Sequence, residues 1–207
     1  MRSKHLSWIL VAAILSTLAA AGENLIKDGD CGAEPMSEEF GLCGITEQAT
    51  LSLVADGTDG NRCLKFELTK YRTDKDGKRL VNTKLRIGGT RRVWGFPCKP
   101  DTLYRFSVEI KGDAPRAMID FLEWPDPANN YRGCRTKRTD VHLIRPQKEW
   151  TRYQGSFRTG PDAKRAALCI VFWGNEAKRD MPEKIGQYVL IDRIRVEEAG
   201  PETDAAR

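Results

Sequence analysis

Residues 117–127 read AMIDFLEWPDP, and their pattern predicts a β-strand with two different faces. Side chains two residues apart share one face of a strand, so the apolar row and the remaining side chains point to opposite sides. The first set is Ala117, Ile119 and Phe121, and the second is Met118, Asp120, Leu122 and Trp124. An acid and a tryptophan therefore share the side that the regular apolar row does not use. Two interpretations follow: Trp124 fills a core, or its ring is a flat surface on which a ligand stacks.

The same alternation recurs along most of the chain. The runs are CLKFEL at 63–68, LYRFSVEIKG at 103–112, TRYQGSFRT at 151–159, ALCIVFWG at 167–174 and YVLIDRIRVEE at 188–198. Turn-forming Gly, Asp and Pro residues separate them, and no helical periodicity is evident after residue 22. The sequence thus predicts an all-β fold, an antiparallel β-sandwich that forms a single domain over residues 22–198.

The two ends of the chain differ from this domain. Arg2 and Lys4 precede a nearly unbroken apolar run, and small residues stand at 19–21. Residues 1–21 therefore have the features of a secretory signal peptide and are too short for a spanning helix. We expect a secreted, periplasmic or extracellular protein whose mature chain has no membrane span. Residues 199–207 are small and polar, which is typical of a frayed tail.

Charge and cysteine content limit the classes of partner. Without residues 1–21 the chain has 32 basic and 29 acidic side chains, and a scattered excess of +3 does not favour nucleic acid. The six cysteines are at 31, 43, 63, 98, 134 and 169. An even number in an exported protein favours disulfides, with Cys31–Cys43 as the preferred local bridge, although some can be ordinary buried thiols.

Few residues are suited to catalysis. There is no C-x-x-C motif, no G-x-S-x-G motif, and His142 is the only histidine after residue 21, so zinc or serine-hydrolase chemistry is not favoured. Asp120 and Glu123 are three apart on one strand and face opposite sides, so they cannot converge as a glycosidase pair. A distant pair such as Asp120 with Asp192 stays open. We expect a protein that is not an enzyme, with a small glycoside hydrolase as a third alternative.

Five segments, in this order and spacing, resemble a known family. They are NLIKDGD at 24–30, PCKPDTLYRFSVEIKG at 97–112, EWTRYQGSFRT at 149–159, AALCIVFWG at 166–174 and GQYVLIDRIRVEE at 186–198. The chain resembles the carbohydrate-binding modules of the CenC type (families four and nine), within the galactose-binding-domain-like jelly rolls. The resemblance implies a non-catalytic sandwich that binds a polysaccharide or glycan, often beside a hydrolase. Because this chain departs from the family in having only a signal peptide and one module, we expect it to work alone or to bring its ligand to a separately encoded glycoside hydrolase or envelope protein. The main alternative is a protein–protein or envelope-structure module of the same fold that binds no sugar.

The resemblance also implies a structural calcium between the start of the domain and the aspartate of the last strand, here Asp192. The family's second ligand is a glutamate after an aromatic residue, and those two positions are occupied here by Cys31 and Gly32. Asp30 or Glu34 could supply a replacement carboxylate.

Candidate sugar-binding residues combine rings with polar groups, because a sugar offers an apolar face and a rim of hydroxyls. Trp124 with Asp120 forms the first pair, and Trp173 and Tyr131 could complete a platform. Trp94 is open to either a core or a site role. Arg86, with Arg91 and Arg92, suits an acidic polysaccharide, although such arginines are more often a solvated strand face. The competing interpretation is that Trp124 and Trp173 pack under loops as a second core. For Trp150 the resemblance implies a core role, because the family has a packing tryptophan at this position.

Overall fold

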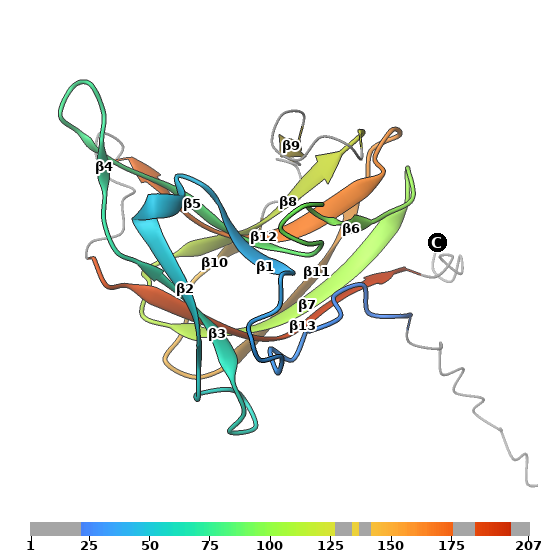
Figure 1. The fold of residues 1–207 in the computed structure, drawn as a ribbon, viewed down its shortest axis with the longest axis horizontal. Helices are drawn as coiled ribbons and strands as arrows, with labels where there is room; N and C mark the ends of the chain where they lie inside the picture. The colour runs from blue at the N-terminus through green and yellow to red at the C-terminus, as the bar shows by residue number, and fades with distance from the viewer. Residues whose placement is uncertain (1–21, 127–133, 137–141, 176–184, 200–207) are drawn as a thin grey trace, which may run out of the picture.

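A computed structural model of the chain describes residues 22–126, 134–136, 142–175 and 185–199. The predicted signal peptide and residues 200–207 lie outside the described residues. Two antiparallel sheets are stacked on each other (Figure 1). The prediction of an all-β sandwich is thereby confirmed. No helix in the described part of the chain is long and apolar enough to cross a membrane.

The larger sheet has eight strands, five of which follow the order β1-β5-β12-β8-β10. These are β1 (Phe40–Gly44), β5 (Arg79–Ile87), β12 (Arg165–Asn175), β8 (Ala117–Trp124) and β10 (His142–Ile144). Three two-residue strands extend it: β4 (Arg72–Thr73) pairs with β5, β6 (Phe96–Pro97) with β12, and β9 (Arg135–Thr136) with β8. The strand predicted from residue 117 onward is β8, which lies next to the central strand β12.

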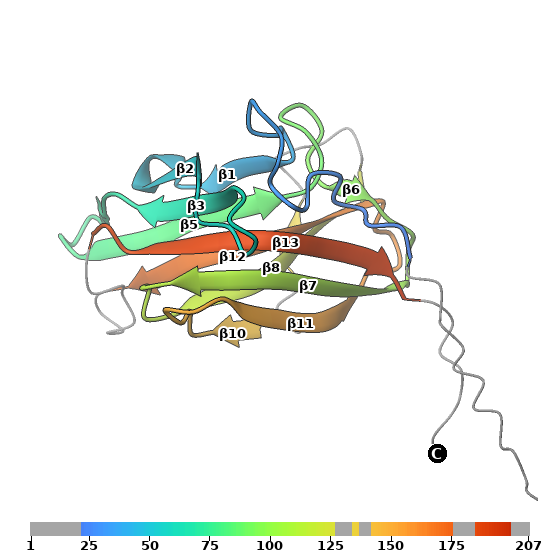
Figure 2. The ribbon, with the colours of Figure 1, turned by 90° about the horizontal axis from the view of Figure 1, so that it is seen from below.

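The smaller sheet has five strands in the order β11-β7-β13-β3-β2. These are β11 (Thr151–Arg158), β7 (Leu103–Gly112), β13 (Tyr188–Glu198), β3 (Cys63–Leu68) and β2 (Ala49–Val54). A single 3-10 turn, η1 (Thr46–Gln48), precedes β2. Figure 2 shows β13, β7 and β11 side by side in this sheet. In both sheets most of the long neighbouring strands are distant in sequence, as in a jelly roll, whereas β2 and β3 are consecutive.

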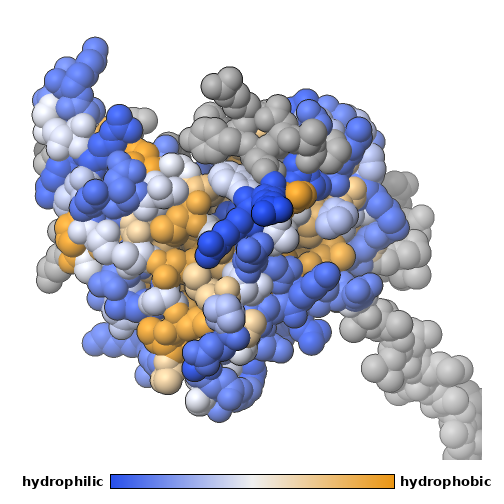
Figure 3. Space-filling view, in the orientation of Figure 1, coloured by the Kyte–Doolittle hydropathy of each residue, from blue (hydrophilic) through white to orange (hydrophobic). Residues whose placement is uncertain are grey.

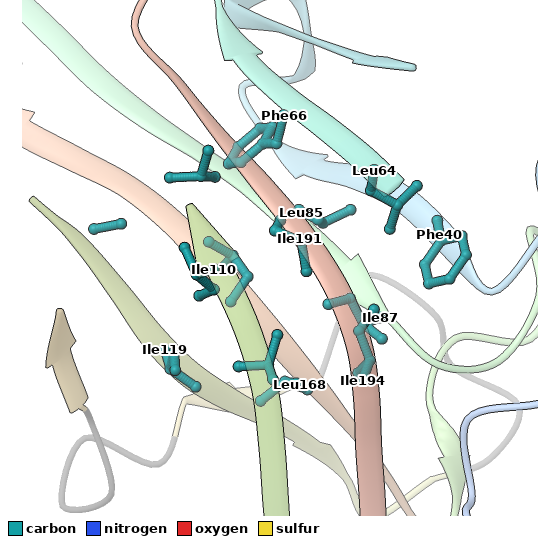
Figure 4. Packing of buried hydrophobic residues seen from close by; sticks show 14 of the residues in the cluster. Phe40, Leu64, Phe66, Leu85, Ile87, Ile110, Ile119, Leu168, Ile191 and Ile194 are labelled. Carbon is teal, nitrogen blue, oxygen red and sulfur yellow. The ribbon is translucent and has the colours of Figure 1, made fainter. Parts of the chain in front are cut away.

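The core lies between the sheets and is built from the inward row of each strand. Ile119 and Leu168 come from the larger sheet, and Ile110 and Ile191 from the smaller one (Figure 4). Burying each such side chain stabilises the folded state by about 1.5–3 kcal/mol. The apolar row of an alternating strand therefore determines which side of the strand faces the core.

The turn before β7 depends on a left-handed residue. Asp101 has φ of 49°, a conformation that aspartate tolerates better than most residues. The N–H of Asp101 donates to the carbonyl of Gly160 at 3.1 Å, and Arg158 Nη1 donates to the carbonyl of Asp101 at 2.9 Å. The turn thereby connects β7 to the end of β11.

The start and the end of the described domain lie side by side (Figure 2). The N–H of Leu25 donates to the carbonyl of Val196 at 2.8 Å. The Asn24 side chain donates to the carbonyl of Ile194 at 3.0 Å and accepts from the N–H of Val196 at 3.0 Å. The first segment is thus an extra partner of β13.

All six cysteines are free thiols in the structure. Cys31 belongs to the core between the sheets, whereas Cys43 belongs to a second cluster on the outside of the larger sheet. The preferred pairing of Cys31 with Cys43 is wrong because a sheet separates the two side chains.

Candidate functional site

The two faces of β8 are as predicted. Ala117, Ile119 and Phe121 belong to the core between the sheets. Leu122 and Trp124 belong to a second apolar cluster on the outer face of the larger sheet, with Met118 packed against it. The register of β12 on β8 and β5 adds Ala167, Cys169 and Val171 to this cluster, and β1 adds Cys43. The outer face of the larger sheet therefore has a small core of its own.

Trp124 is the centre of that second cluster and is fully buried, with 0% of its surface exposed. Its ring meets Trp94 edge to face, with centroids 6.5 Å apart and planes at 86°. The Arg165 guanidinium lies 5.7 Å from the Trp124 ring centroid and donates a hydrogen bond to the Trp94 carbonyl. The structure thus agrees with the interpretation of Trp124 as a second core rather than an exposed stacking surface.

Asp120 lies on the same face and is bound to a neighbouring strand. Its Oδ2 accepts a hydrogen bond from Lys84 Nζ of β5 at 2.8 Å, and its Oδ1 accepts from the N–H of Phe121. Burial alone would lower the pKa of Lys84, but Cys169 and Asp120 raise that pKa overall. Glu123 is on the other face of β8, and its carboxylate accepts a hydrogen bond from the N–H of Gly160 at 2.9 Å. Asp120 therefore ties β8 to β5 across β12.

Trp94 is only half-buried and lines a pocket beside β1, which we call the Trp94 pocket. Its volume is about 440 Å³. The lining residues are Met36, Phe40, Gly41, Leu42, Thr46, Leu51, Arg86, Arg91 and Trp94. Figure 3 shows apolar surface between charged rims in the region of β1, β2 and β3. The pocket combines an indole ring, apolar walls and the exposed Arg91, which has no hydrogen bond or ion pair within the described residues.

Arg86 is placed in this pocket by a glycine on the facing strand. Gly41 pairs with Arg86, and a Cβ on Gly41 would lie 2.8 Å from Arg86 Nη2. The guanidinium donates to the carbonyls of Gly88 and Glu38, and its carbon lies 5.5 Å from the Trp94 ring centroid. Only 2% of Arg86 is exposed, and burial lowers its pKa. The expectation of a solvated strand face is wrong for Arg86, which holds the Trp94 loop.

Two thiols belong to the apolar cluster on the outer face of the larger sheet. Cys43 of β1 and Cys169 of β12 stand on either side of β5, within hydrogen-bonding reach of each other. The contact with Cys169 lowers the pKa of Cys43, and Lys84 and Arg86 lower it further against the effect of burial. The same contact and complete burial raise the pKa of Cys169.

Two of the predicted site residues are not placed by the structure. Tyr131 lies outside the described residues. Trp173 belongs to β12 and its backbone pairs with Asn82, but its side chain is outside the described part. The pocket walls at Met36, Leu42 and Leu51 were missed by sequence reasoning. Their only signal is an apolar character that any core residue shares.

The residues predicted for calcium do not fit the ion as a pair. Asp192 is buried, and its Oδ2 accepts hydrogen bonds from the N–H and the hydroxyl of Thr58, both at 2.9 Å. Its Oδ1 accepts from the N–H of Arg193 at 2.7 Å. Asp30 is exposed, and Glu34 forms an ion pair with Arg62 at 2.7 Å. Within the described ranges no three His, Cys, Asp or Glu residues are grouped to hold a metal.

Comparisons with known proteins bear on the fold. No family model matches the chain. No curated protein matches it either. A solved structure described as "CBM4 structure and function" superposes with a TM-score of 0.54 at 11% identity, covering 84% of this chain and 99% of its own.

A second solved structure is the enzymatically active domain of tailspike protein 4 from bacteriophage CBA120. It superposes with a TM-score of 0.55 at 14% identity and covers 85% of this chain. This chain spans 21% of that protein's length. The fold is a β-sandwich jelly roll like that of the CBM4 structure, and this is the fold that the resemblance implied.

Proposed function

We propose that this protein is an exported, non-catalytic carbohydrate-binding module related to families four and nine, and that it binds a glycan in the Trp94 pocket. The observation that carries the proposal is the half-exposed Trp94 ring beside the exposed Arg91, over an apolar wall. An indole face matches the C–H face of a sugar, and a guanidinium hydrogen-bonds its hydroxyls. The buried Trp124 beneath Trp94 holds the ring in place.

The acids of β8 support a non-catalytic role. Asp120 is in an ion pair with Lys84, and Glu123 is hydrogen-bonded to the N–H of Gly160 on the other side of the strand. A glycosidase needs two carboxyl groups that converge across one bond, at about 5–10 Å. These two groups do not share a face.

The experiment is affinity electrophoresis of residues 22–207 in gels that contain xylan, mixed-linkage β-glucan, galactomannan or hydroxyethylcellulose. We expect retardation by at least one of them and no release of reducing sugar. Trp94→Ala should weaken binding by about tenfold or more, and Trp94→Phe should retain most of it, because stacking of about 1–3 kcal/mol is lost only in the first.

Trp150→Ala is the matched control, since Trp150 is also half-buried but precedes β11 at the other sheet. Its binding should equal that of the parent. Passage of the parent through all four gels without retardation, or equal losses in the Trp94 and Trp150 variants, would contradict the proposed site. A protein partner bound by the same pocket would then point to the alternative module without a sugar ligand.

A further inference from the structure

A second groove lies on the opposite side of the molecule, on the outer face of the five-stranded sheet. Its volume is about 440 Å³. The lining residues are Arg105, Phe106 and Ser107 of β7, Arg152, Gln154, Gly155 and Ser156 of β11, and Arg195 and Glu197 of β13. These three strands are neighbours, as Figure 2 shows. We call this the arginine groove.

The strand register places one guanidinium on each of the three strands. Arg105 of β7 lies between Ser156 and Glu197, and Arg195 of β13 lies opposite Ser107. Arg152 of β11 donates to Ser107 Oγ at 3.3 Å. Neighbouring strands are roughly 4.8 Å apart and alternate residues roughly 6.7 Å apart, so the three charges are spread across the sheet rather than gathered at one point.

Positive side chains outnumber negative ones in this groove, with three arginines against one glutamate. Within the described residues none of the three arginines forms an ion pair, and Glu197 is the one acid in the lining. Two exposed arginines elsewhere are paired, Arg62 with Glu34 at 2.7 Å and Arg135 with Asp162 at 2.8 Å. An unpaired set of guanidinium groups on one open face is suited to carboxylate or sulfate groups, which it can bind with two hydrogen bonds each.

The floor of the groove distinguishes it from the Trp94 pocket. Its lining includes the small residues Ser107, Gly155 and Ser156, and no tryptophan. Recognition by stacking, of a neutral sugar or of a nucleic acid base, therefore has little surface to use here. The arrangement favours a ligand whose repeated negative groups match the spread of positive ones.

We propose that the arginine groove is a second binding site, and that it takes an acidic polysaccharide with carboxylate or sulfate groups along its chain. The inference does not rest on the Trp94 pocket, because no residue lines both sites. A molecule with both sites can hold two polysaccharide chains at once.

The test is affinity electrophoresis of residues 22–207 against polygalacturonate, dextran sulfate and neutral dextran, at low and at moderate salt. We expect retardation by at least one acidic polymer, none by neutral dextran, and weaker retardation as salt rises. The triple variant R105Q/R152Q/R195Q should lose at least about tenfold in affinity. The matched control R62Q/R72Q/R135Q makes the same change in net charge away from the groove and should bind like the parent.

Two further samples keep the result decisive. Glu197→Gln removes the acid of the groove and should tighten binding, which an unfolded variant cannot imitate. Trp94→Ala should bind the acidic polymer like the parent, so failure of one site is separable from failure of the other. Equal losses in both triple variants, or no retardation of the parent, would overturn the site. If a DNA oligonucleotide were bound as tightly as the acidic polysaccharides and released by the same triple variant, that result would overturn the proposed class of ligand.

Discussion

Trp124 lies beneath Trp94, and the two rings meet edge to face. The alternation of β8 is a local property, so the side on which Trp124 lies could be predicted from residues 117–124 alone. Whether the Trp124 ring is exposed depends on its contacts with Trp94 and Arg165. These two residues are about 30 and 40 residues away in the sequence, so no local pattern could predict the contacts. The same reason explains why Trp94, and not Trp124, lines the pocket.

At this scale we expect Trp124→Ala to lower the free energy of unfolding by about 3–5 kcal/mol, because a fully buried ring leaves a cavity. Urea unfolding followed by circular dichroism measures the change. The half-buried Trp150, changed to alanine in parallel, should cost clearly less. A loss below about 1 kcal/mol for Trp124→Ala would show that the ring is not a packing residue.

Among the elements, β3, β7, β8, β11, β12 and β13 could be predicted because each alternates over six residues or more. The order β5-β12-β8 could not, since it joins segments that are distant in sequence. The Trp94 pocket depends on that order, because β1 brings Gly41 against Arg86 only through its pairing with β5. Of the predicted site residues, Trp94 and Arg86 line this pocket, whereas Trp124 is buried beneath Trp94.

The turn before β7 gives a prediction for one element. Asp101 has a left-handed backbone, which costs a β-branched residue about 1–2 kcal/mol and glycine little. Asp101→Val should lower the free energy of unfolding by about that amount or more, whereas Asp101→Gly and Asp101→Asn should stay near the parent. Thermal melts of the three variants provide the check. Equal stability of the valine and glycine variants would mean that this turn is not left-handed in solution.

For the molecule as a whole, buried thiols make stability depend on pH in the alkaline range. Burial raises the pKa of Cys63 to about 11 and that of Cys98 to about 12, and it also raises the pKa of Cys31. The folded state therefore keeps protons that the unfolded chain releases above its ordinary thiol pKa of 9.0. This contribution to stability is complete below pH 9 and is lost as the pH rises toward 11 and 12.

We expect the free energy of unfolding of the reduced protein to fall between pH 9 and pH 10.5, by up to about 1.4 kcal/mol per pH unit for each thiol. Urea titrations at several pH values with a reductant measure the slope. Cys98→Ala should reduce that slope. The lysines and tyrosines are the same in the variant and the parent, so the difference between the two slopes is due to the Cys98 thiol. An unchanged slope in this variant would argue against a raised pKa for Cys98.

The pairing of residues 24–29 with the end of β13 has a mechanical consequence. Leu25 lies against Val196, and Gly29 accepts from the N–H of Ile194, so the first segment and the last strand run in opposite directions from one end of the molecule. A force that pulls residues 22 and 199 apart meets these hydrogen bonds one after another instead of all together. The domain should therefore open like a zipper at low load when it is stretched between its two ends. A load carried through only one end and a bound polysaccharide does not pull directly across that seam.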